Sequence, residues 1–536
     1  MPGRYRRSFI AGFFGILLLG GLLLVRDFGV SFDEGVQRVS GQISLLYVFQ
    51  KLPAGVQHRL LSPQAAALIA QKGGDRQLAT YKDRDYGVVY ELPASAVEQV
   101  LHLHDERQVY LLRHTLNFLV CYAGFIAFYL LAARRLGSWR WGLLGTLLLV
   151  LSPRLFADYF YNDKDAVFLA LFTVGLATAV PFIRRPGWAT ALACALACAL
   201  AIDVRVMGVL LPAATLAFVG LRAVRGEYKG QRTAAPVGLY FVLLSALTVT
   251  FWPYLWEAPL QNFTAAWSRM SHFAWPGTMA YQGQLIKAVG LPWHYPLVWI
   301  GLTVPLLHLL LFGVGAVAVL GNVLRRGWRL YATDGEWQDL LFLGLAVVPV
   351  LAVIVLHSVL YNGWRQLYFT YPLLLLLALR GLAFLWRWQP AGAAMQRYWR
   401  PALGLATGLS LAVIAGRMVR LHPLENLYFN ALAPTATERY YDIDYWGLSY
   451  RQGLAWITQH DTRPRIRVFS SDIQPLILNS YMQPAAERAR LELVASPKEA
   501  DYILSSYLPL FPAPAGKPRH SIEAEDLRVL DIYQLR

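Results

Sequence analysis

Long apolar runs, separated mostly by short charged loops, fill the first four fifths of the chain. A helix needs about 20 mainly apolar residues to cross a bilayer. By this rule the chain has about eleven candidate spans, near residues 9–25, 110–131, 138–157, 165–183, 187–203, 206–222, 235–252, 296–320, 340–357, 368–386 and 401–418. The pattern therefore predicts a polytopic α-helical membrane protein.

Two loops are long enough to fold. The first covers residues 26–109, where helical patterns occupy Ser62–Gln71 and Glu91–Leu103. The second covers residues 253–295 and is rich in Trp, Tyr and Pro. Both would lie on the same side of the membrane.

The tail after the last span has a different pattern. Short apolar runs typical of buried strands are Arg465–Ser470, Leu491–Val494, Tyr502–Ser505 and Val529–Tyr533. Between the first two, Ala485–Arg490 predicts a short helix, with Pro484 suited to its first turn. We therefore expect a transmembrane domain over residues 1–420 and a small α/β domain over residues 421–536.

Composition agrees with a membrane protein. Hydrophobic residues make up 56% of the 536 residues and charged residues 15%, whereas globular domains average roughly 25% charged. With a cytoplasmic N-terminus, the inner loops hold most of the loop cations: Arg4, Arg6, Arg7, Arg134, Arg135, Arg140, Arg184, Arg185, Arg222, Arg225, Lys229, Arg232, Arg325, Arg326, Arg329, Arg387, Arg397 and Arg400. The positive-inside rule then predicts an outside tail. The net charge of +16 thus reflects topology and the lipid bilayer rather than nucleic-acid binding.

The sequence indicates neither a cleaved signal peptide nor a cysteine motif. The first apolar run follows a basic segment, but Val25-Arg26-Asp27 offers no small-residue cleavage site, so we expect a retained span. Cys121, Cys194 and Cys198 all fall within spans, where neither a disulfide framework nor a zinc spacing is found.

An acidic pair, Asp33-Glu34, follows the first span by about eight residues. This position lies at the boundary between lipid and water, where carboxylates lose hydration. Such groups are either solvated at a loop tip or kept for chemistry.

A second charged group, Asp163-Lys164-Asp165, opens the fourth span after Asn162. These residues could cap the helix and favour its N-terminal dipole. One residue would suffice for capping, so a functional role for Asp163 or Asp165 stays open.

Arg365 lies among aromatic residues between the ninth and tenth spans. Its planar guanidinium suits a phosphate, although a side chain reaching a lipid headgroup is the alternative. The His102-Leu103-His104-Asp105-Glu106-Arg107 group could bind a metal, but its spacing matches no zinc pattern and favours solvated charge.

Several motifs together resemble the GT-C membrane glycosyltransferases, particularly bacterial relatives of the dolichyl-phosphate-mannose protein mannosyltransferase and aminoarabinose-transferase group. They are Phe32-Asp33-Glu34, Asn162-Asp163-Lys164-Asp165 and Trp364-Arg365-Gln366-Leu367-Tyr368-Phe369-Thr370-Tyr371-Pro372, together with the tail segments at residues 422–430 and 442–450.

The resemblance implies a polyprenyl-phosphate-linked sugar donor and transfer with inversion to an acceptor, which could be a glycolipid, a glycan or a protein. It also implies a bacterial cytoplasmic membrane location with the reaction at the outer face. Asp33 would be the general base, supported by Glu34. Asp163, Lys164, Asp165, Arg365 and Tyr368 would bind substrate or its phosphate, with Lys164 and Arg365 offsetting the charge of the departing phosphate. A divalent cation held by Asp33, Glu34 and Asp165 is left open.

Two other functions compete with a transferase. A transporter or lipid flippase would commonly show two related halves, and no repeated half is evident in the sequence. A catalytically silent scaffold that kept the fold is the third reading, since a fold alone does not define an activity.

Overall fold

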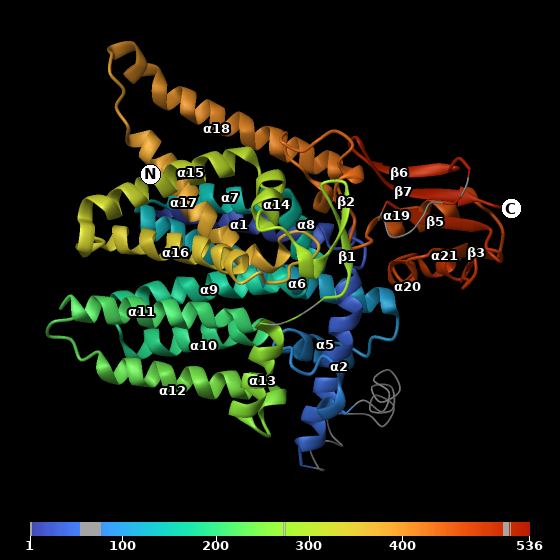
Figure 1. Cartoon of the computed structure of the whole chain (residues 1–536), viewed down its shortest axis with the longest axis horizontal. Coiled ribbons are helices and arrows are strands. Elements are labelled where there is room, and N and C mark those ends of the chain that lie inside the picture. The colour runs from blue at the N-terminus through green and yellow to red at the C-terminus, as the bar shows by residue number, and fades with distance from the viewer. Residues whose placement is uncertain (1–2, 54–76, 272, 274, 508–513, 515) are drawn as a thin grey trace.

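The computed structural model describes residues 3–53, 77–271, 273, 275–507, 514 and 516–536. Long helices run side by side through most of the molecule, and a small sheet domain lies beyond one end of them (Figure 1). The expected helical stretch Ser62–Gln71 falls outside the described residues. The predicted fold class, a polytopic helical membrane protein with a small α/β tail domain, is confirmed.

The apolar helices follow the predicted spans closely. They are α1 (Gly3–Leu24), α6 (Glu106–Leu136), α7 (Trp139–Val150), α8 (Pro153–Tyr161), α9 (Asp165–Arg184), α10 (Trp188–Val204), α11 (Leu210–Val224), α12 (Ala234–Phe251), α15 (Leu306–Arg326), α16 (Asp334–Val355), α17 (Tyr371–Arg387) and α18 (Ala393–Leu421). Within the described part, nine spans are long and apolar enough to cross a membrane, or ten if α7 and α8 form one bent span. The remaining expected span is α10, a shorter apolar helix.

Two expected spans are broken. The segment predicted at 138–157 bends by 76° between α7 and α8, where Pro153 starts the second helix because it cannot continue the first. The segment predicted at 296–320 divides into α14 (Tyr295–Thr303) and α15, with Val304 and Pro305 between them. Proline thus converts two apolar runs into helix pairs.

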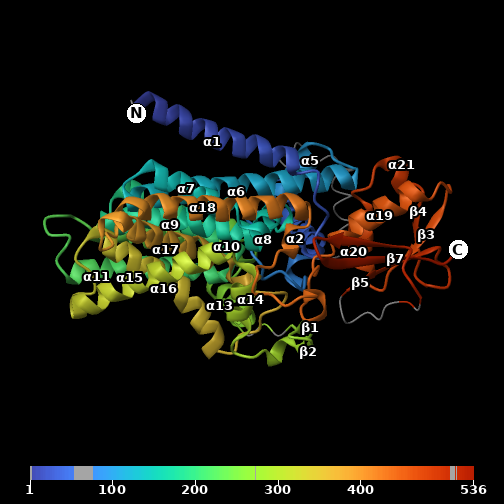
Figure 2. The same cartoon turned by 90° about the horizontal axis from the view of Figure 1, so that it is seen from above.

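Helices α9 and α17 form the centre of the bundle. Of their most apolar windows, 72% and 78% are buried, against 11% for α1. Helices α15 and α17 approach closely because Gly315 faces the backbone of Leu377 and Gly381 faces that of Leu311, leaving no room for a Cβ. Small residues allow such close packing where lipid supplies no hydrophobic driving force between helices. Figure 2 shows α1 along one margin of the bundle.

The first and second loops gather at one end of the bundle (Figure 1). The first contains α2 (Phe32–Lys51), η1 (Leu78–Thr80) and α5 (Glu91–Val100), and α5 begins where the sequence predicts. The second contains η3 (Pro253–Leu255), α13 (Pro259–Ser271), the hairpin β1 (Thr278–Tyr281) and β2 (Gln284–Lys287), and η4 (Ala288–Gly290).

The tail domain is built on a five-stranded mixed sheet in the order β4-β3-β5-β7-β6. Its elements are α19 (Ser449–His460), β3 (Ile466–Phe469), α20 (Ile473–Ser480), α21 (Ala485–Arg488), β4 (Leu491–Leu493), β5 (Tyr502–Ser506), β6 (His520–Ala524) and β7 (Leu527–Gln534). All four expected strands and the short helix are present. The amphipathic helix α19, the helix α20 and the half-buried edge strand β6 are additional. Polar residues interrupt the apolar positions of α19 and β6, and α20 is only eight residues long.

The tail domain is fixed to the start of α2. The Asn479 side chain on α20 accepts a hydrogen bond from the Val30 backbone N–H (3.0 Å) and donates one to the Val30 carbonyl (3.2 Å). One turn later, Gly35 faces the Leu478 side chain. The segment that carries Asp33 is therefore held by the tail domain.

Candidate functional site

Three residues far apart in the sequence meet at the end of the bundle where the two loops and the tail domain lie. Asp33 lies in the first turn of α2, Asp165 begins α9, and Arg365 begins η6 (Arg365–Thr370). The Arg365 guanidinium donates to Asp33 Oδ2 (2.6 Å) and to Asp165 Oδ2 (3.2 Å). One arginine thus joins two of the carboxylates that the sequence singles out.

Two more cations surround this group. Arg205, which follows α10, pairs with Asp165 Oδ1, and the Lys164 ammonium lies 3.2 Å from the centre of the Tyr86 ring. We call Asp33, Lys164, Asp165, Arg205 and Arg365 the outer charge cluster. It holds three cations and two carboxylates, so it can accept one further anion.

The outer charge cluster is buried on one side and open on the other. The side chains of Asp165 and Arg365 are 1% and 4% exposed, whereas that of Asp33 is 25% exposed. Water and substrate can therefore reach Asp33 most easily.

Burial and charge shape the proton affinities here. Burial alone would raise the pKa of Asp33, but the Arg365 guanidinium, with Lys164 and Arg205, outweighs it and holds the pKa below its usual value. Burial, together with the Arg205 cation, lowers the pKa of Lys164 to about 7. Lys164 can therefore gain or lose its proton near neutral pH.

A buried polar wall continues from Arg365 toward the tail segment 442–450. The Arg365 guanidinium lies over the Trp446 ring, 4.6 Å from its centre, and the Tyr161 ring lies against Trp446. Buried polar atoms without a hydrogen-bond partner here include Arg365 Nε, Asp158 Oδ1, Tyr161 Oη, Arg154 Nη2 and Trp446 Nε1. Unpaired buried polar atoms are costly, so this wall is suited to a polar ligand.

Tyr368 belongs to this wall rather than to the ion pairs. It is buried, and its ring lies edge-on to Trp364 at 4.8 Å. It lies within electrostatic reach of Tyr445 and Asp158.

Asp163 and Glu34 face a different set of neighbours. Glu34 accepts a hydrogen bond from the Ser31 backbone N–H (2.7 Å) and lies 3.0 Å from His114 Nε2. Asp163 therefore has different neighbours from Asp165, although only Lys164 lies between them in the sequence. Burial, reinforced by Glu91 and Glu34, raises the pKa of Asp163 well above its usual value, so this carboxyl is suited to staying protonated.

Next to these residues lies a second buried group, which we call the inner ion-pair cluster. Arg113 contacts Glu91 and Glu98 at 2.5 Å each. Arg38 contacts Glu98 at 3.1 Å and also pairs with Glu106. This cluster ties α2, α5 and α6 together.

The charged run before α6 has structural partners. Asp105 caps α6 by accepting from the Arg107 backbone N–H (3.2 Å) and pairs with Arg488 of the tail domain (2.9 Å). Across the described residues, no group of three or more His, Cys, Asp or Glu side chains is placed to hold a metal ion.

Sequence reasoning missed several residues of this site. Arg205 directly follows the apolar run at 187–203, and like Arg365 it is a lone cation at the edge of a span, but it was assigned no role from the sequence. Trp446 lies within the tail segment 442–450, and Asp158 and Tyr161 lie just before the Asn162–Asp165 motif. Their meeting depends on the bend between α7 and α8 and on the return of the tail.

No family model matches this sequence, and no curated protein matches it. Two solved structures of ArnT from Cupriavidus metallidurans align with 98% of this chain and 98% of their own. The apo structure has a TM-score of 0.49 at 14% identity, and the structure bound to undecaprenyl phosphate has 0.46 at 13%. Both neighbours bear the name of an aminoarabinose transferase, the group that the motifs of this sequence resemble.

Proposed function

We propose that this chain is a glycosyltransferase that moves a sugar from a polyprenyl phosphate to an acceptor at the outer face of the cytoplasmic membrane. The N-terminus would be inside, and the tail domain would be outside. The observation that carries the proposal is the excess of cations around Asp33 and Asp165 at the mouth of a membrane bundle.

Charge balance supports a phosphate ligand. The outer charge cluster has one more cation than it has carboxylates, and its cations come from three separate segments. A donor phosphate placed there would be stabilised as it departs with the electrons of the broken bond. Fixed charges aimed at a developing negative charge are commonly the largest part of a rate gain.

The Asp33–Arg365 ion pair suggests how the base becomes active. Held by Arg365, Asp33 is a weak base. A donor phosphate on Arg365 would compete for the guanidinium and loosen its hold on Asp33, whose pKa would then rise. The freed carboxylate can take the acceptor's hydroxyl proton while the acceptor oxygen attacks the anomeric carbon.

The bond changes balance without another reactant. The acceptor oxygen bonds to the anomeric carbon as the bond from that carbon to the phosphate oxygen breaks, which inverts the anomeric centre. The electron pair leaves with the polyprenyl phosphate, and Asp33 holds the proton. A divalent cation is assigned no step, because Asp33 and Asp165 are already engaged by guanidinium groups.

The test is donor turnover. Purified chain in lipid nanodiscs is incubated with labelled polyprenyl-phosphate sugars and an acceptor extract, and release of polyprenyl phosphate is measured. We expect Asp33→Asn to lower the rate about 10²–10⁴-fold, as the loss of a general base does. Glu257→Gln is the matched control, since Glu257 is an exposed carboxylate paired only at the surface with Lys51 and Tyr47.

Two results would count against the proposal. Release that persists in Asp33→Asn would remove Asp33 as the base. If the native chain released no polyprenyl phosphate from any donor yet moved lipid across the bilayer, the flippase reading would replace the transferase.

A further inference from the structure

The tail domain contains a crevice of its own. Strands β3 and β5 are parallel neighbours in its sheet. The chain leaves β3 toward β4 on one side, by way of α20 and α21, and leaves β5 toward β6 and β7 on the other. In open α/β sheets, ligands bind outside the carboxyl ends of strands where the connections diverge in this way.

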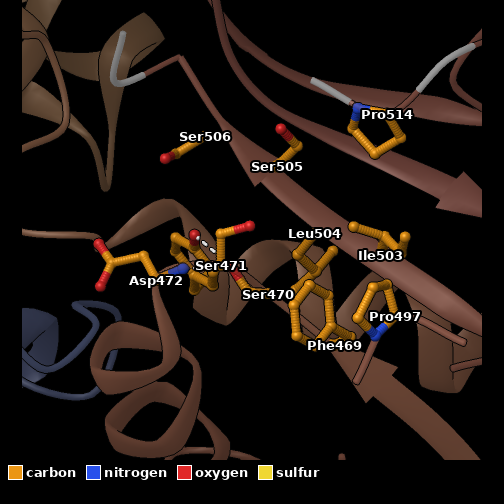
Figure 3. Close-up of a pocket in the computed structure, with 11 residues that line it drawn as sticks. Phe469, Ser470, Ser471, Asp472, Pro497, Ile503, Leu504, Ser505, Ser506 and Pro514 are labelled. Atoms are coloured by element: carbon orange, nitrogen blue, oxygen red, sulfur yellow. Dashed lines mark hydrogen bonds between the residues drawn. The ribbon is translucent and has the colours of Figure 1, made fainter. Parts of the chain in front are cut away.

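A pocket of about 210 Å³ lies at that place. Figure 3 shows its two walls, with Ser470 and Asp472 after β3 on one side and Ser505 and Ser506 at the end of β5 on the other. Ligand pockets for drug-sized molecules are roughly 300–1,000 Å³. The smaller volume fits a single ring.

The pocket offers hydrogen-bonding groups that the protein leaves free. The Ser506 hydroxyl is buried, and its polar neighbour is the Tyr450 hydroxyl, which is already engaged by Ser470. No hydrogen bond or ion pair to the Asp472 carboxylate occurs among the described residues. By contrast, Ser470 Oγ is engaged by the Tyr450 hydroxyl (2.8 Å) and the Asp472 backbone N–H (3.2 Å). Free hydroxyl and carboxylate groups at a cavity wall are suited to ligand hydroxyls.

The charge of the pocket excludes an anion. Among the described residues that line it, none is Lys, Arg or His, and Asp472 is the one carboxylate. The Phe469 ring, Ile503 and Pro497 supply an apolar side. The apolar wall thus faces hydroxyl and carboxylate groups. A neutral ring that carries hydroxyl groups on its edge would match this arrangement, and a sugar is such a ring.

We propose that this pocket binds one neutral sugar residue of the acceptor. The role as acceptor site rests on the proposed transferase function; sugar binding itself does not. Asp472 directly precedes α20, and α20 packs against the start of α2, the helix that carries Asp33. The contact between α20 and α2 therefore positions both an acceptor held in this pocket and the base Asp33.

Binding is measured first, on the full chain in nanodiscs free of glycoside detergent. The probes are glucose, galactose, mannose and N-acetylglucosamine, followed by saturation-transfer NMR. We expect at least one sugar to bind, and both Asp472→Asn and Ser506→Val to weaken it by at least about fivefold. Asp526→Asn is the matched control, because Asp526 is an exposed carboxylate on the β6–β7 turn, and it should bind as the native chain does.

The outcomes separate this proposal from the proposed function. Unchanged sugar binding in both pocket variants, binding of none of the sugars, or inorganic phosphate binding in their place would overturn it. In the turnover assay, the pocket variants should raise the acceptor KM at least about fivefold, whereas Asp526→Asn should leave it unchanged. An unchanged acceptor KM would overturn the acceptor role. A chain that binds sugar but releases no polyprenyl phosphate would instead contradict the transferase alone.

Discussion

The outer charge cluster and the inner ion-pair cluster are built from the same side-chain chemistry but differ in balance. The inner cluster has three glutamates for two arginines, and each arginine contacts at least two glutamates. The outer cluster has three cations for two carboxylates, and one of its carboxylates is partly exposed. One group is closed on itself, and the other can take an anion.

This difference separates structural from functional charge. Arg113 is 1% exposed and also donates to Ser95 (3.1 Å), so its donors are largely used within the protein. Arg365 and Arg205 each keep a buried Nε without a partner. Buried charge alone is therefore a poor indicator of a functional site. Unpaired hydrogen-bond donors next to an excess of positive charge are a better indicator.

Among the changes that compare the two clusters, the largest effect is expected from removing the Arg365 guanidinium of the outer charge cluster. Arg365→Met should lower donor turnover about 10²–10³-fold, because a fixed charge at the departing phosphate is lost. Arg205 and Lys164 remain to balance the charges of Asp33 and Asp165. The free energy of unfolding in detergent should therefore fall less than it does in Arg113→Met. Arg465→Met, at an arginine that is 74% exposed, serves as the control. An equal loss of turnover in Arg365→Met and Arg113→Met would remove the distinction between the two clusters.

The reverse pattern is expected for the inner ion-pair cluster. Arg113→Met leaves Glu91 and Glu98 buried with less compensation, which should lower the free energy of unfolding by about 3–5 kcal/mol. Turnover per folded molecule should fall far less than in Arg365→Met. Denaturant unfolding followed by tryptophan fluorescence measures the first quantity, and a stability equal to the native chain's would show that Arg113 is not structural.

Lys164 gives the outer charge cluster a pH dependence. Its pKa is about 7, so raising the pH from 6.5 to 8.5 neutralises it and should weaken donor binding by roughly tenfold. Lys164→Arg should abolish this dependence, as arginine stays charged. The unfolded chain holds this proton more tightly than the folded chain, so raising the pH from about 7 toward 10.5 should also stabilise the fold. A pH-independent donor affinity in the native chain would exclude Lys164 from phosphate binding.

The smallest effect is expected from neutralising one acid of the inner ion-pair cluster. Glu98→Gln leaves two arginines facing two glutamates and keeps the side-chain shape. We expect a loss of about 1–3 kcal/mol in the free energy of unfolding, the size of hydrogen bonds to charged groups. Turnover should be unchanged; a large drop would mean that the two clusters act as one.

Individual charged residues of this site could be singled out from the sequence, although Arg205 was not among them, and their arrangement could not be predicted. Asp33, Asp165 and Arg365 could be singled out because each is a charge at the edge of an apolar run. The contacts between them span 332 and 200 residues of sequence, and no local pattern indicates them. Asp163 shows the limit, since the turn between α8 and α9 places it near Glu91 and Glu34, although it is only two residues from Asp165.

The sequence by itself determined the apolar helices, the position of the tail sheet and the individual charges at the membrane boundary. These follow from local requirements: a bilayer demands about 20 apolar residues per span, and a buried strand demands a short apolar run. Tertiary structure alone decided which charges meet, because electrostatic attraction depends on distance in space and not along the chain. It also decided that Arg113 is closed off by its partners while Arg365 keeps a donor free for a ligand.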